Sequence, residues 1–261
     1  MLLLGLIIHI NNKYIFVIIE MVKVLVLYVF HKFDDSVDYF LKHCIFQDEN
    51  IDFLIIANDI KFKFNLVNLP EYVMTMVRKN VGRDFGGWSE GLLKDQLYKK
   101  YDKFIFANST IMGPFIQDNT KWTDYYINGL KDNIKLFGST INNVYHSHVQ
   151  TYIFSLDKEA LTYLIEIGKF SITKYLRSAR DAQNNEILMS KDITDKGWNI
   201  GCLLKCYHGI DFTFKNKSKK DYGDKLHTDI MYEKYRNVLW NEYEVVFIKG
   251  NRIKFTSSLI R

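Results

Sequence analysis

The chain has 261 residues, of which 48% are hydrophobic and 25% charged, the balance of an ordinary globular protein. This composition excludes a disordered chain, and the length fits one large α/β domain. The net charge of +5 is a small difference between 35 basic and 30 acidic residues, which suits an anionic ligand and argues against a nucleic-acid-binding protein.

The first 20 residues contain two apolar runs, 1–8 and 15–19, separated by a polar stretch. A membrane span needs about 20 continuous apolar residues, and a signal peptide needs a basic start and a cleavage site, so neither is expected. Asn11-Asn12 could turn a β-hairpin between the two runs. Alternatively, Met21 is the working start. We expect residues 1–20 to be an extension and the functional domain to span 21–261.

From residue 22 onward, strand and helix patterns alternate along the chain. Apolar and β-branched runs predict strands at 22–30, 51–57, 73–77, 103–107, 134–138, 149–156, 198–206 and 244–249. Helical spacing and capping residues predict helices at 37–44, 88–98, 158–168 and 183–195. The alternation predicts a single Rossmann-like α/β domain, with a mainly parallel sheet and helices on both faces.

Three cysteines and one lysine-rich run carry weaker signals. Cys44, Cys202 and Cys206 lack metal-ligand spacing, so we expect buried, reduced thiols, which favour a cytoplasmic location. Four lysines between 215 and 220 form either a solvated loop or a phosphate-contacting patch.

Ligands of open α/β sheets bind beyond the carboxyl ends of the strands, which here points to residues 58–59, 80–88 and 108–115. In the second stretch, Gly82 and the glycines at 86 and 87 would let the backbone approach a ligand, and a helix after them would direct N–H groups at an anion. Arg83, helped by Arg78 and Lys79, could neutralise phosphate, and Asp84 could bind a sugar hydroxyl. The alternative is a glycine turn with Arg83 and Asp84 as a surface ion pair.

Two further groups could contact a substrate. His146 and His148 share one side of a segment that we expect to be extended, without a carboxylate or cysteine at zinc-site spacing. Asn184 or Asn185 would cap a helix and place Glu186 in its first turn. Glu186 is then either a helix-starting acid or a carboxylate that takes a proton from an acceptor hydroxyl.

The order of these motifs resembles the rhamnan-synthesis F-like family and related GT-A-like glycosyltransferases, with members from protists and large DNA viruses. The resemblance rests on residues 80–87, the helix expected after them, residues 101–103 and a strand that ends in Asn108-Ser109. It continues through residues 137–139, 148–150, 186–197 and 244–249. It implies a GT-A-like domain that transfers a sugar from a nucleotide-sugar donor to a hydroxyl acceptor in glycan synthesis. For a viral member, it implies a location in the host cytoplasm or virus factory.

The resemblance also implies a set of site residues. The donor would be bound by Asn80, Gly82, Arg83, Asp84, Asn108 and Ser109. Glu186, followed by Leu188 and Gly197, matches the position of the family's catalytic base, with His146 and His148 facing the acceptor. GT-A enzymes hold Mg²⁺ or Mn²⁺ with paired aspartates where this chain has Asn108-Ser109-Thr110, so cation use stays open. The alternative is a catalytically degenerate protein that binds a nucleotide or carbohydrate.

Overall fold

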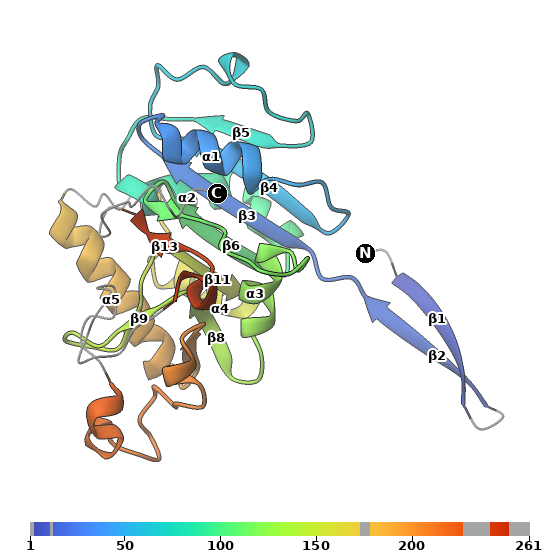
Figure 1. Ribbon diagram of the computed structural model, residues 1–261, viewed down its shortest axis with the longest axis vertical. Helices are drawn as coiled ribbons and strands as arrows, with labels where there is room; N and C mark the ends of the chain where they lie inside the picture. The colour runs from blue at the N-terminus through green and yellow to red at the C-terminus, as the bar shows by residue number, and fades with distance from the viewer. Residues whose placement is uncertain (1–2, 11–12, 173–177, 227–240, 251–261) are drawn as a thin grey trace.

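The computed structural model describes residues 3–10, 13–172, 178–226 and 241–250 (Figure 1). At the start of the chain, β1 (Leu3–Ile10) and β2 (Lys13–Glu20) pair as an antiparallel hairpin with Ile10 opposite Lys13. The expected hairpin is therefore confirmed, although Asn11-Asn12 lies outside the described residues. In Figure 1 the hairpin projects away from the main sheet. That it lies outside the functional domain stays a prediction.

The centre of the protein is a seven-stranded sheet with the order β12-β8-β11-β6-β3-β4-β5. Its strands are β3 (Val24–Phe30), β4 (Ile51–Ala57), β5 (Met74–Val77), β6 (Lys103–Asn108), β8 (Ile134–Gly138), β11 (Ile153–Asp157) and β12 (Asn199–Cys202). Strand β11 runs antiparallel to β6 and β8, and every other neighbouring pair is parallel. Because β11 is reversed, the residues before it lie at the edge where the parallel strands end.

Helices cover both faces of this sheet, as the sequence predicts. They are α1 (Asp35–His43), α2 (Arg83–Leu93), α3 (Trp122–Gly129), α4 (Lys158–Glu166), α5 (Ala179–Asp195) and α6 (Glu242–Val245). Alternate residues of β3 face opposite sides, as a strand requires. Leu25 and Leu27 pack in one core with residues of α2, α4 and α5, whereas Val26 and Tyr28 pack in another with residues of α1 and α3.

Short elements complete the described fold. They comprise the strands β7 (Ile111–Met112), β9 (Ile141–Asn142), β10 (His148–Val149) and β13 (Ile248–Lys249), and the 3-10 helices η1 (Phe64–Leu66), η2 (Lys94–Lys100), η3 (Lys205–Tyr207) and η4 (Lys219–Lys225). Strand β10 pairs with β9, and β13 pairs with β7. No helix in the described part of the chain is long and apolar enough to cross a membrane.

Several element boundaries differ from the sequence-based predictions. The segment 149–156 is not one strand, because a turn at 151–152 separates β10 from β11. The segment 244–249 contains the end of α6 and then β13. Helix α2 begins at Arg83 instead of residue 88, because Gly82 caps it in the left-handed conformation (φ 78°). Helix α5 begins at Ala179 because Ser178 and Asp181 form a capping box.

The cysteine prediction is correct for two of the three thiols. Cys44 and Cys202 are buried, but Cys206 is exposed. The prediction fails at Cys206 because β12 ends at Cys202 and the chain then turns through η3 instead of continuing as a strand. The lysine-rich run 215–220 is exposed, and Lys219 Nζ donates a hydrogen bond to the Asn143 carbonyl.

Candidate active site

Polar side chains at the ends of β4 and β6 hold the start of α2. Asn58, directly after β4, is buried, and its Nδ2 donates to the carbonyl oxygen of Arg83 at 3.0 Å. Asn108, the last residue of β6, donates from Nδ2 to Asp84 Oδ2 at 2.9 Å. These hydrogen bonds bring the three stretches of the sequence together at one edge of the sheet.

The glycines of this segment have a different role from the predicted one. A Cβ on Gly86 would lie 2.0 Å from the Val81 carbonyl oxygen, and one on Gly87 would lie 2.7 Å from Val29 Cγ2. Both residues lie inside α2, where they allow the helix to pack closely against its own turn and against β3. Only Gly82, at the helix cap, needs a backbone conformation that other residues rarely adopt.

Arg78 holds this turn in place. Its Nε donates to Glu90 Oε2 at 2.7 Å, its Nη1 to Asn58 Oδ1 at 2.6 Å and its Nη2 to the Val81 carbonyl at 2.9 Å. These bonds use three of the five N–H donors of a guanidinium, so Arg78 stabilises the turn and its phosphate contact stays a prediction. Its side chain is only 9% exposed.

Arg83 has the opposite environment. It is exposed, and its guanidinium makes no hydrogen bond or ion pair with any described residue. The alternative of an Arg83–Asp84 surface ion pair is therefore not observed. Lys79 and Asn80 are exposed in the turn before α2, so both can be reached by a ligand. Ser109 is half-buried, and its backbone N–H donates to the Val29 carbonyl.

Asp84 is the most perturbed carboxyl group at this edge. Burial raises its pKa to about 6. The hydrogen bond from Asn108 and the attraction of the basic residues His31, Arg83 and Lys249 act in the opposite direction and lower this pKa. Thr110 orients the Asn108 amide, because its N–H and Oγ1 both contact Asn108 Oδ1, at 3.0 and 2.6 Å. Asp84 is thus a partly buried acid whose surroundings are basic.

Sequence reasoning missed His31 and Lys249. His31 follows the carboxyl end of β3, so the rule that selected the ends of the other strands would have found it. Lys249 lies on β13, which reaches the site only because it pairs with β7, with Lys249 opposite Ile111. That pairing joins segments far apart in the chain, and no local signal in the sequence predicts it.

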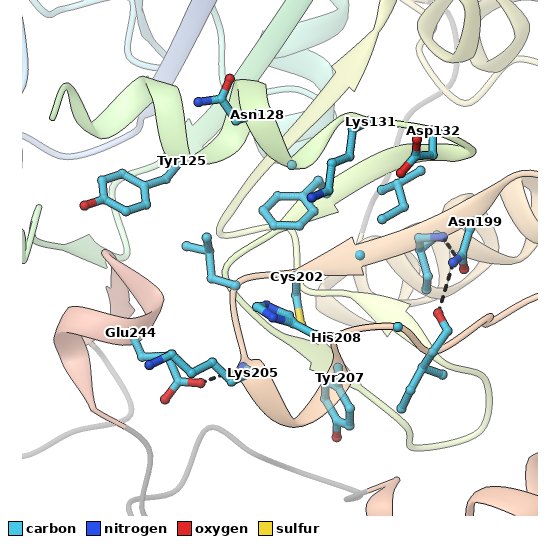
Figure 2. Close-up of a pocket in the computed structure, with 18 of the residues that line it drawn as sticks. Tyr125, Asn128, Lys131, Asp132, Asn199, Cys202, Lys205, Tyr207, His208 and Glu244 are labelled. Atoms are coloured by element: carbon cyan, nitrogen blue, oxygen red, sulfur yellow. Dashed lines mark hydrogen bonds between the residues drawn. The ribbon is translucent and has the colours of Figure 1, made fainter.

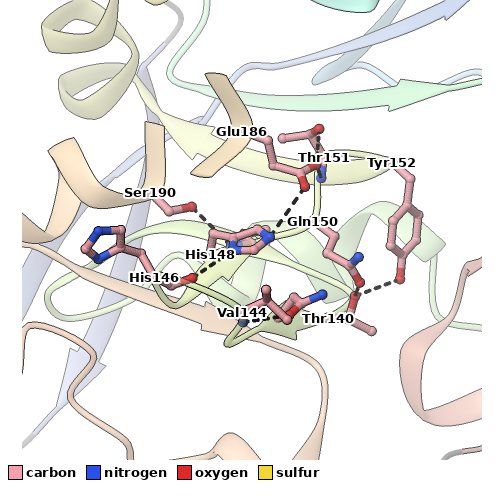
Figure 3. A network of polar contacts seen from close by, with 11 residues as sticks. Thr140, Val144, His146, His148, Gln150, Thr151, Tyr152, Glu186 and Ser190 are labelled. Atoms are coloured by element: carbon pink, nitrogen blue, oxygen red, sulfur yellow. Dashed lines mark hydrogen bonds and ion pairs between the residues drawn. The ribbon is translucent and has the colours of Figure 1, made fainter. Parts of the chain in front are cut away.

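Glu186 and His148 are brought together, as the predicted site requires (Figure 3). Glu186 Oε2 accepts hydrogen bonds from the Thr151 N–H at 2.6 Å and from Thr151 Oγ1 at 2.5 Å. Glu186 Oε1 lies 3.5 Å from His148 Nε2, and His148 Nδ1 is 2.8 Å from the His146 carbonyl oxygen. Glu186 is therefore two turns into α5 and held by its neighbours, not in the first helical turn.

His146 does not share the position of His148. His148 is buried, whereas His146 is exposed and its ring points away from the cluster in Figure 3. The expectation that both rings lie on one side was wrong because residues 143–147 form a turn instead of a strand. Ser147 Oγ donates to Asn143 Oδ1 at 2.6 Å within that turn, and Tyr145 adopts a φ of 65°.

Two adjacent residues connect the Asp84–Asn108 pair to the Glu186–His148 pair. The Asn108 N–H donates to the Tyr152 carbonyl at 3.1 Å, and the preceding residue, Thr151, binds Glu186. One edge of the sheet therefore carries a carboxylate held beside an imidazole, a second acid, and exposed basic groups. Such an arrangement can take a proton from one bound molecule while anchoring an anionic group of another.

The side chains at this edge do not fit a divalent cation. Within the described ranges, no group of three or more His, Cys, Asp or Glu side chains could hold a metal ion. Asp84 Oδ2 already accepts from Asn108, and Asn108 Oδ1 already accepts from Thr110. Mg²⁺ and Mn²⁺ prefer several carboxylate oxygens, so we assign no step to a cation.

Solved structures with similar folds include three proteins at low identity. One is a glucose-1-phosphate thymidylyltransferase of Bacillus anthracis, with a TM-score of 0.37 and 11% identity over 69% of this chain and 85% of that chain. Another is a glycosyltransferase involved in glycosylation of the major capsid of PBCV-1, with a TM-score of 0.37 and 12% identity over 68% of this chain and 80% of that chain. The third is the glycosyltransferase GlyE of Streptococcus pneumoniae TIGR4, with a TM-score of 0.39 and 12% identity over 71% of this chain and 46% of that chain. No curated protein matches the chain. The sequence model of rhamnan synthesis protein F matches residues 53–258, well over half of the chain. The chain belongs to the rhamnan synthesis protein F family.

Proposed function

We propose that this protein is a glycosyltransferase of polysaccharide synthesis, which moves a sugar from a nucleotide-sugar donor to a hydroxyl group of a glycan acceptor. The observation that carries the proposal is the meeting of two pairs, Asp84–Asn108 and Glu186–His148, at one edge of the sheet. Membership of the rhamnan synthesis protein F family supports the same class of reaction.

The donor would lie against the start of α2. The exposed guanidinium of Arg83 can grip a diphosphate with two hydrogen bonds, and His31 and Lys249 add positive charge beside it. Together they would stabilise the charge that develops on the diphosphate as the bond to the sugar breaks. Asn80 is exposed just before the Gly82 cap of α2 and would also contact the donor, while Asp84 and Ser109 would bind hydroxyl groups of the ribose or sugar.

Glu186 would act as the base on the acceptor. It takes the proton of the acceptor hydroxyl, whose oxygen forms a bond to the anomeric carbon while the bond from that carbon to the diphosphate oxygen breaks. Two hydrogen bonds from Thr151 stabilise the ionised carboxylate. His148 would hold this carboxylate in place, because its Nδ1 lies against the His146 carbonyl and its Nε2 faces Glu186, so it is a positioning residue. The exposed ring of His146 would contact the acceptor.

Glu186→Gln tests this assignment, because glutamine keeps the shape and the acceptor oxygen of the carboxylate. We expect the variant to bind nucleotide sugars like the wild type in a thermal-shift assay, and to lose transfer and donor hydrolysis by about 100-fold or more. Glu49→Gln is the matched control, because Glu49 is exposed and precedes β4 at the opposite edge of the sheet. Failure of the wild type to bind any sugar nucleotide at millimolar concentration would remove the proposal.

A second function, binding without transfer, is favoured by one observation. The end of β6 carries Asn108-Ser109-Thr110, and the amide of Asn108 already contacts Asp84 and Thr110. A non-catalytic protein would bind a nucleotide through Arg83 and lose that binding in Arg83→Ala. Its wild type would turn over no donor, so Glu186→Gln would change nothing measurable.

A further inference from the structure

A second hollow lies apart from the candidate active site, along β8 and β12 (Figure 2). Its volume is about 950 Å³, near the upper end of ligand pockets, which are on the order of 300–1,000 Å³. Phe137 and Gly201 form its floor, α3 forms one wall and the chain from 205 to 211 forms the other. We call this hollow the edge groove, because β12 is the last strand of the sheet.

The edge groove exists because α3 covers only part of this face. Helix α3 has eight residues, and its last residue, Gly129, packs directly on Phe137, where a Cβ would lie 2.4 Å from Cδ1. Beyond that contact, the surface of β12 forms the floor of the groove. The lining residues of β8 and β12 are therefore mainly apolar, whereas those of α3 and of the chain from 205 to 211 include polar side chains.

The charges of the lining argue against an anionic ligand. Five acidic side chains line the groove, against two lysines, Lys131 and Lys205; the acids are Asp118, Asp124, Asp132, Asp211 and Glu244. A nucleotide, a nucleic acid or an anionic lipid headgroup would be repelled by this excess. No group of acids or histidines in the described chain could hold a metal ion. The chemistry favours a neutral, polar ligand.

Aromatic and amide groups of the lining match the surface of a sugar. Tyr243 is 43% exposed and lines the groove next to Glu244 in the chain. Asn128 on α3 and His208 on the facing wall are exposed, and their side chains make no hydrogen bond with a described residue. A pyranose presents apolar C–H faces, which pack on aromatic rings, and hydroxyl groups, which both donate and accept hydrogen bonds.

Hydrogen bonds fix the wall formed by 205–211. Asn199 Nδ2 donates to the Ile210 carbonyl at 3.0 Å, and the Lys205 N–H donates to Glu244 Oε1 at 2.6 Å. The Tyr207 hydroxyl accepts from Asn143 Nδ2 at 2.9 Å, and Asn143 belongs to the turn that leads to His148. A wall fixed before binding lowers the entropy lost on binding, and this last bond links the groove to the acceptor side of the candidate active site.

We propose that the edge groove is a second carbohydrate-binding site, which holds a neutral oligosaccharide outside the active site. In a polysaccharide-synthesising enzyme, the bound segment would be part of the glycan already built. That role rests on the proposed function, whereas binding of the oligosaccharide does not.

Calorimetric titration with a rhamnose trisaccharide and with maltotriose tests the proposal. We expect the wild type to bind at least one of them, and Asn128→Ala and Tyr243→Ala to weaken that binding about 10-fold. Tyr72→Ala is the matched control, because Tyr72 is 41% exposed and precedes β5 at the opposite side of the sheet. The control should bind like the wild type, and all three variants should melt as cooperatively as the wild type.

Three results would overturn the proposal. The first is no binding of either trisaccharide at millimolar concentration, and the second is an equal loss of trisaccharide affinity in Tyr72→Ala. The third is a loss of trisaccharide affinity in Glu186→Gln with no loss in the two groove variants. Nucleotide-sugar binding measured on the same samples separates this outcome from failure of the proposed function. If only the groove proposal is wrong, the protein still binds nucleotide sugars. If only the donor-site proposal is wrong, the protein still binds the trisaccharide.

Discussion

Asp84→Asn should stabilise the protein at neutral pH. The pKa of Asp84 rises from its ordinary value of 3.8 to about 6 on folding, mainly because of burial. A carboxyl group whose pKa is raised on folding makes its full contribution to the unfolding free energy below pH 3.8, its unfolded pKa. That contribution is lost as the pH rises through about 6, its folded pKa. Asparagine does not titrate and its amide oxygen can still accept from Asn108, so the variant keeps the contact without the buried charge.

The size of the effect follows from the two pKa values. At about 1.4 kcal/mol per pKa unit, the rise corresponds to about 3 kcal/mol of unfolding free energy. For a domain of this size, 1 kcal/mol changes the melting temperature by about 2–4 °C. The variant should therefore gain roughly 6–12 °C over the wild type between pH 4 and pH 7.

Thermal and urea unfolding of both proteins from pH 4 to pH 8 measures this difference. Asp59→Asn is the control, because it makes the same change of charge two residues after the end of β4, and the Asp59 side-chain oxygen accepts from the Lys61 N–H. Parallel curves for the wild type and Asp84→Asn across this pH range would refute the reasoning. A gain of equal size in Asp59→Asn would assign it to net charge instead of burial.

Two further predictions concern packing and thiol exposure. Gly86→Ala should destabilise the protein by about 1–3 kcal/mol in urea unfolding, because its Cβ would meet the Val81 carbonyl oxygen. Gly250→Ala should be tolerated, because the close contact of the added Cβ is with the flexible end of a methionine side chain. Equal losses of unfolding free energy in the two variants would contradict this prediction. In the native protein, a thiol reagent should label the exposed Cys206 and no other described cysteine. Labelling should accelerate towards pH 10, because partial desolvation of the thiol and the charge of Glu244 raise the Cys206 pKa to about 11. Rapid labelling of three thiols without denaturant would disprove it.

The sequence predicts those parts of the fold that depend on local patterns of apolar and polar residues. The strands at 51–57 and 134–138 coincide with β4 and β8, because short, mainly apolar segments, each with one charged residue near its start, end there on polar or glycine residues. The rule that ligands bind beyond strand ends selected Asn58, Asp84 and Asn108, and these three residues do meet. Each prediction needed only the residues of one strand and its following turn.

The features that escaped prediction depend on contacts between distant segments. The reversed strand β11 brings Thr151 and Tyr152 to the edge where Asn108 lies, but its sequence resembles those of the parallel strands of the sheet. Lys249 reaches Asp84 through the pairing of β13 with β7. Periodicity within a strand does not indicate its partner or its direction, so neither contact was available from the sequence.

Arg78 and Arg83 show why charge alone does not identify a binding residue. Both lie in the same basic, glycine-rich stretch, and the sequence gives each the same role. In the structure, the little-exposed Arg78 side chain donates to Asn58, Glu90 and the Val81 carbonyl, so its loss would remove the donor to the buried Asn58 amide oxygen and disturb the turn. Arg83 is exposed and unpaired within the described chain, on a turn that Arg78 makes rigid. A fixed turn that presents a free guanidinium beside a partly buried acid is the arrangement that an anionic donor requires, because the positive charge is in place before the ligand binds.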